Sequence, residues 1–104
     1  MSRWTTVAPW RPMPGNLGQA QALANGANTK LTNAIPANCH AVQLSAAGGN
    51  CMVVVGNNRV STATTDVLVK ATDGPQVIGC EPGDTIQAWG LAAGVTLYAI
   101  PVTH

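Results

Sequence analysis

Hydrophobic and polar positions alternate with a period of two from Thr29 to the end of the chain. This alternation is typical of β-strands, because successive side chains of a strand point to opposite faces. The alternating runs are short, and signals rich in Gly, Pro, Asn or Asp separate them. The strands that the pattern predicts are 29–33, 39–45, 51–56, 66–71, 76–80, 85–90 and 95–103.

The clearest turn signal is Glu81-Pro82-Gly83-Asp84. Pro82 presets φ for the first central position of a type II turn, and Gly83 tolerates the positive φ that the second position needs. Two strands meet at this turn, and we expect the other strands to pack around it.

Regular short strands separated by turns are typical of antiparallel sandwiches and barrels. The sequence therefore predicts an all-β fold, a small antiparallel β-sandwich or a jelly-roll-like barrel, for residues 29–104. The longest polar stretch is 56–65. We expect it to be a loop or a weakly paired segment that crosses between two sheets, as a Greek-key or jelly-roll topology requires.

The alternation also assigns strand faces. Tyr98, Ile100 and Val102 share one face of their strand, and the apolar residues between them share the other. Residues 51–55 are apolar on both faces, which indicates a central or interfacial strand. The strand at 95–103 is also apolar on both faces. Two such strands in a small chain indicate burial against a neighbouring molecule.

Residues 1–28 differ from the rest, since three prolines fall within 1–15. Proline interrupts helices and strand ladders, so this segment is predicted to be an extended N-terminal arm. Trp4, Trp10 and Met13 are costly to leave in water, and aromatic anchors on an extended arm usually pack on a surface. We predict that they contact the chain's own body, a neighbouring copy or another protein.

The end of the arm, residues 17–28, is ambiguous. Residues 19–24 are good helix formers, but the run is too short to be stable alone and Asn25-Gly26 would end it. This stretch is either a short helical turn or a first edge strand. The predicted organisation is thus an arm over 1–28 and a β-sandwich domain over 29–104.

Charged residues make up only 9% of the chain, against about 25% in typical domains. Such an uncharged surface is common where a partner covers much of it, and the alternative explanation is a neutral extracellular module. The net charge is +1 and the basic residues are spread out, so no nucleic-acid partner is predicted. No apolar run is long enough to span a membrane, and no signal peptide is recognised. We therefore expect synthesis in a cytoplasm.

The three cysteines suit neither a secreted disulfide framework, which prefers an even number, nor a zinc site. Cys39, Cys51 and Cys80 are 12 and 29 residues apart, far wider than the close pairs of zinc-binding motifs. We expect three small buried residues. No metal or cofactor is predicted.

No catalytic constellation is recognised. Cys39 and His40 are adjacent in a predicted strand, so their side chains point to opposite faces and cannot form a nucleophile–base pair. Glu81 and Asp84 flank Pro-Gly and are explained by turn chemistry. The chain is therefore predicted not to be an enzyme.

Part of the chain resembles small virion structural proteins of tailed bacteriophages. The residues that carry the resemblance are 35–45 (Ile-Pro-Ala-Asn-Cys-His-Ala-Val-Gln-Leu-Ser), 50–56 (Asn-Cys-Met-Val-Val-Val-Gly), Val77 and 80–88 (Cys-Glu-Pro-Gly-Asp-Thr-Ile-Gln-Ala). The resemblance implies a small β-sandwich or jelly-roll that coats a capsid as a decoration or cement protein, or that sits at the neck or tail. It assigns no functional residues, and the arm is not part of it.

Our first hypothesis is a capsid decoration protein on the virion surface, made in the host cytoplasm, whose partner is the major capsid protein or another virion protein. It would bridge capsomers by burying apolar area. Trp4, Trp10, Met13 and Tyr98 are the contact residues expected for it. The low charge and the two-sided strands favour a homo-oligomer, with a trimer ahead of a dimer because a capsid offers threefold sites.

The alternative is a glycan- or receptor-binding module associated with the phage neck, tail or fibre. Trp89 or Tyr98 would then form an aromatic platform, beside Asp84 or beside Asn57 and Asn58. Against this, a strand Trp more often caps the core.

Overall fold

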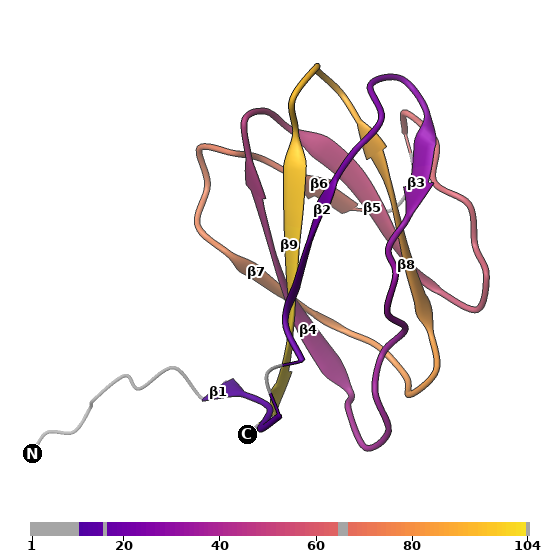
Figure 1. The fold of residues 1–104 in the computed structure, drawn as a ribbon, viewed down its shortest axis with the longest axis vertical. Coiled ribbons are helices and arrows are strands. Elements are labelled where there is room, and N and C mark those ends of the chain that lie inside the picture. Colours follow the sequence, from indigo (N-terminus) through magenta and orange to yellow (C-terminus); the bar gives the residue numbers. More distant parts are fainter. Residues whose placement is uncertain (1–10, 16, 65–66, 104) are drawn as a thin grey trace, which may run out of the picture.

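The computed structural model describes residues 11–15, 17–64 and 67–103. These residues form β-strands joined by turns and loops, with no helix among them. The strands make two antiparallel sheets that pack face to face (Figure 1). The all-β sandwich predicted from the alternation is thus confirmed.

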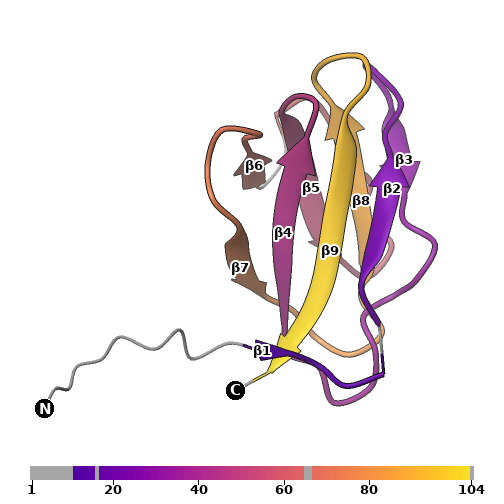
Figure 2. The same cartoon turned by 60° about the vertical axis from the view of Figure 1, so that its left-hand side comes forward.

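Sheet A has β9 near its middle, and Figure 2 shows this strand running almost the full height of the molecule. On one side β9 pairs with β4, which in turn pairs with the edge strand β7. On the other side β1 and β2 pair with successive parts of β9. The bounds are β1 Arg11–Pro12, β2 Gln19–Ala22, β4 Ala41–Ala47, β7 Gln76–Gly79 and β9 Thr96–Thr103.

Sheet B has the order β3-β8-β5-β6. Among the described strands, only the connections β1–β2 and β5–β6 stay within one sheet. The expectation that 56–65 crosses between sheets is therefore wrong, because β5 and β6 are paired neighbours. The bounds are β3 Asn28–Lys30, β5 Cys51–Gly56, β6 Val67–Val69 and β8 Thr85–Gly90.

The turn between β7 and β8 has the predicted geometry. Gly83 has φ of 88°, and the Asp84 N–H donates to the Glu81 carbonyl at 3.1 Å. The Asp84 carboxylate accepts the Glu81 N–H at 2.9 Å, which closes the turn from the other side. The Gly83 N–H also donates to the carbonyl of Ile35 at 2.8 Å, so the turn is tied to the β3–β4 connection.

Part of the predicted arm belongs to the sandwich. The sequence placed the boundary at residue 28, yet β1 and β2 pair with β9 before it. Of the two alternatives for 17–28, the structure forms the edge strand, because β9 offers a free row of backbone groups that outweighs a weak helical preference. Residues 1–10, with Trp4 and Trp10, lie outside the described residues.

The core lies between the two sheets. All three cysteines are buried and free, as predicted. Both sheets contribute apolar side chains, and Leu31 and Ile35 of the β3–β4 connection join them. The largest fully buried apolar residues are Leu44, Ile86, Leu97, Val42, Val53, Val54, Val69 and Val95.

Candidate interaction surfaces

The outer face of sheet A is built around Tyr98 and Ile100. The neighbouring residues of β9 are buried, so these two side chains point away from the core. The strand register places Tyr98 between Ala20 and Ser45, and Ile100 beside Gln43. We define the outer face of sheet A as Gly18, Ala20, Ala22, Gln43, Ser45, Ala47, Val77, Gly79, Thr96, Tyr98 and Ile100, with Pro12, Ala41 and Val102 at one end.

None of these described residues is charged. The solvent-facing side of an antiparallel sheet usually carries polar and charged side chains. Here Tyr98 is 42% exposed and is surrounded mainly by small residues. At the far end Ala41 and Val102 are already buried. The outer face of sheet A therefore exposes apolar surface, and none of its described residues carries a charge that would oppose contact with another protein.

The outer face of sheet B carries a row of three large apolar residues on three adjacent strands. Met52 of β5 lies between Trp89 of β8 and Leu68 of β6 in the register. Trp89 and Met52 are half-buried, and Leu68 is 40% exposed. We call these three residues the Trp89 row.

The chain itself covers the rest of this face. The segment 57–61 passes over it, and the Ser61 N–H donates to the Asn28 side-chain oxygen at 3.0 Å. The Ser61 hydroxyl contacts the same oxygen. The Asn28 side-chain nitrogen donates to the Gln87 side chain at 2.8 Å. Val54, on the outer side of β5, is fully buried. Part of the two-sided apolar pattern of β5 is therefore satisfied within this chain.

Trp89 and Tyr98, the two alternatives for a glycan-binding aromatic platform, lie apart. Trp89 belongs to sheet B and Tyr98 to the outer face of sheet A, on opposite sides of the sandwich. Asp84 and Asn58 lie near the start of β8, whereas Trp89 lies near its end. Four strand residues span about 14 Å. The residues named for that platform are thus not brought together.

Met13, predicted as a partner contact, packs against the core of its own chain. Its N–H donates to the carbonyl of Pro101 at 2.9 Å. Trp4 and Trp10, the other two arm contacts, lie outside the described residues.

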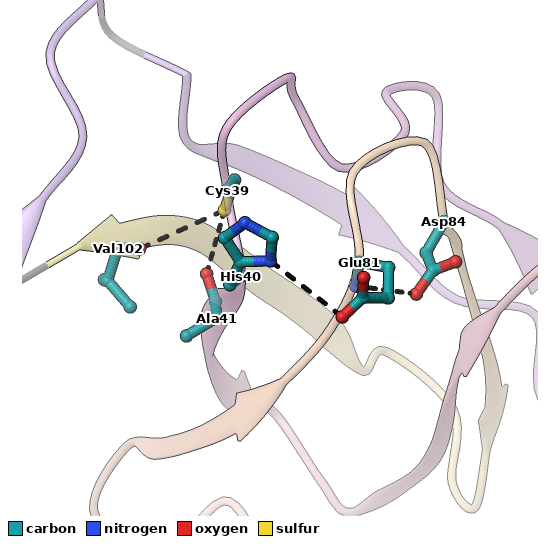
Figure 3. Close-up of polar contacts among 6 residues, drawn as sticks. All are labelled: Cys39, His40, Ala41, Glu81, Asp84 and Val102. Atoms are coloured by element: carbon teal, nitrogen blue, oxygen red, sulfur yellow. Dashed lines mark hydrogen bonds and ion pairs between the residues drawn. The ribbon is translucent and has the colours of Figure 1, made fainter.

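The candidate chemistry near His40 is shown in Figure 3. His40 Nδ1 lies 3.9 Å from Glu81 Oε2, and both side chains are largely exposed. The Cys39 thiol is buried and donates to the Ala41 carbonyl at 3.0 Å, so it does not face the imidazole. The adjacent thiol and imidazole therefore form no nucleophile–base pair. The strand-based reason for this expectation was wrong, because Cys39 and His40 precede β4, which begins at Ala41.

Among the described residues, no group of three or more His, Cys, Asp and Glu side chains could hold a metal ion. The described part of the chain contains no helix long and apolar enough to cross a membrane. No family model, curated protein or solved structure matches the chain.

Sequence reasoning selected Trp89 and Tyr98 but missed the residues beside them. The apolar pattern of 51–55 is a signal for Met52, but alone it indicates only a central or interfacial strand. Leu68 had no signal, because its place in the Trp89 row depends on a register that the sequence does not encode locally. The neighbours of Tyr98 on the outer face of sheet A could not be predicted either, because they too depend on the strand register.

Proposed function

We propose that this chain is a non-enzymatic structural protein of a tailed-phage virion, a capsid decoration protein that bridges capsid subunits. The observation that supports this most is the exposed apolar surface on both outer faces of the sandwich. A bridging protein needs two contact surfaces. A sandwich that binds no other protein is not expected to expose apolar surface on both outer faces. The phage assignment comes from the sequence resemblance alone.

The Trp89 row is the contact that we assign to the capsid. Trp and Met are enriched at protein interfaces, and Trp is also enriched among hot-spot residues. Buried apolar area contributes about 25 cal/mol per Å², but association costs about 4–15 kcal/mol. A single small contact is therefore weak. Many copies on one head, each contacting the capsid through its Trp89 row and joined to another copy, would bind through multivalency.

The experiment is co-sedimentation of the purified protein with phage heads that lack it. Wild type should pellet with the heads. Leu68→Lys should weaken binding at least tenfold, because it places a charge in the Trp89 row. The matched control is Val60→Lys, since Val60 is also an exposed apolar residue, at 62%, but lies outside the row. It should bind as wild type does. Circular dichroism checks that both variants fold.

Two results would contradict the proposal. One is a wild-type protein that stays in the supernatant, and the other is equal binding by Leu68→Lys and wild type. If wild type fails to pellet and instead gives a glycan-array signal that Trp89→Ala abolishes, the glycan-binding alternative replaces this function.

A further inference from the structure

We propose that the outer face of sheet A pairs with the same face of a second copy of this chain, across a twofold axis. The pairing concerns a different surface from the Trp89 row and does not depend on the capsid assignment. A twofold contact through this surface gives a dimer, whereas capsid symmetry led us to expect a trimer.

The first support is electrostatic. In a twofold contact the same patch is used by both copies, so a charged residue near the axis lies close to its own copy. Like charges placed together cost several kcal/mol. No described residue of the outer face of sheet A is charged. The outer face of sheet B differs, because Lys30 lies on it beside Gln87. Among the described residues of the two outer faces, those of sheet A carry no charge, so this face can meet itself without such a cost wherever the axis lies.

The second support is shape. Ala20, Ala22, Ser45 and Ala47 present short side chains around the single large ring of Tyr98. Short side chains let two sheets approach to about the 10 Å of stacked sheets. A Tyr contributes large rigid contact area and a hydroxyl that hydrogen-bonds at the edge of the contact. Because Tyr98 lies on the inner strand β9, a twofold axis through the face brings the two rings near each other.

The size of the face sets the expected strength. Four strand positions at about 4.8 Å and about six residues at 3.4 Å give roughly 400 Å² of projected area per copy. A standard interface buries about 800 Å² of accessible surface per partner. The dimer should therefore be at the weak end of specific contacts, and we expect a dissociation constant in the micromolar range.

The test is sedimentation velocity of the full chain over a range of concentrations at low ionic strength. Wild type should shift from monomer to dimer. Tyr98→Lys and Tyr98→Glu should each weaken self-association at least tenfold, because each variant opposes like charges across the axis. An equimolar mixture of the two variants should recover a dimer, since opposite charges then face each other.

The matched control is Leu68→Lys, whose 40% exposure is close to the 42% of Tyr98 but which lies on the opposite side of the sandwich. It should dimerise as wild type does. If a Tyr98 variant does not fold by circular dichroism, Gln43→Lys and Gln43→Glu replace the pair, because Gln43 lies on the same face beside Ile100.

Four results would overturn the pairing. They are a wild type that remains monomeric at all concentrations, a stoichiometry other than two, full dimerisation of Tyr98→Lys, and a Lys–Glu mixture that remains monomeric. If the capsid covers this face instead, wild type should be a monomer in solution and Tyr98→Lys should bind phage heads less tightly than wild type does. Unchanged head binding by Leu68→Lys while the dimer persists would contradict only the proposed function, so the two proposals fail separately.

Discussion

At the scale of single residues, burial keeps the cysteine thiols protonated and unreactive. Cys51 is fully buried, and burial raises the pKa of its thiol from 9.0 to about 11. Burial also raises the pKa of the Cys80 thiol, to about 12, with further contributions from Cys39 and from the carboxylates of Asp84 and Glu81. Thiols held neutral in this way are poor nucleophiles and poor metal ligands at neutral pH. They serve as small apolar parts of the core.

These raised pKa values predict a stability that depends on alkaline pH. Below pH 9.0 the thiols are neutral in both the folded and the unfolded chain, so they add no pH dependence there. Above it the unfolded chain loses the thiol protons first, which favours unfolding. The free energy of unfolding should therefore fall as the pH rises from 9 towards 11. Urea denaturation at a series of pH values measures this fall.

The comparison variant is Cys51→Ala. It removes one of the titrating thiols, so its stability should fall less steeply with pH than that of wild type, whatever its stability at neutral pH. Equal slopes for the two proteins would show that Cys51 titrates alike in the folded and unfolded chains, contrary to its burial.

At the scale of elements, the segment 57–61 acts as a cover for sheet B. Asn28 holds it in place through Ser61 and at the same time pairs with the buried side chain of Gln87. Asn28→Ala leaves these buried polar groups without their partner, which costs about 1–3 kcal/mol. We expect a loss of stability in that range and faster hydrogen exchange at the Ser61 amide.

Gln21→Ala is the control for this prediction. The Gln21 side chain makes an exposed bond to the carbonyl of the neighbouring Ala22, so its loss should change stability by less than about 0.5 kcal/mol. An Asn28→Ala protein as stable as Gln21→Ala, with unchanged exchange at Ser61, would mean that Asn28 does not hold the segment.

The same elements show what the sequence could and could not predict. β5 and β8 were predicted at their observed bounds, because alternation and flanking turn residues are local signals. The pairing of β2 with β9 and the course of 57–61 depend on residues far along the chain. No local pattern encodes such contacts. For the same reason the sequence pointed to Trp89 and Tyr98 individually but could not assemble the surface around either one.

At the scale of the whole molecule, the sandwich separates two apolar surfaces. The Trp89 row lies outside sheet B, and the uncharged face centred on Tyr98 lies outside sheet A. A body of this kind can hold a second copy on one side and a different protein on the other. Low net charge suits that role, since no strong field opposes close approach in a dense protein shell.

Cryo-electron microscopy of decorated phage heads, at a resolution that separates strands, tests this account most directly. We predict that the Trp89 row will contact the capsid and that the outer face of sheet A will contact the same face of a second copy. A map in which both faces lie in solvent, with the protein held only by its loops or strand edges, would contradict the account.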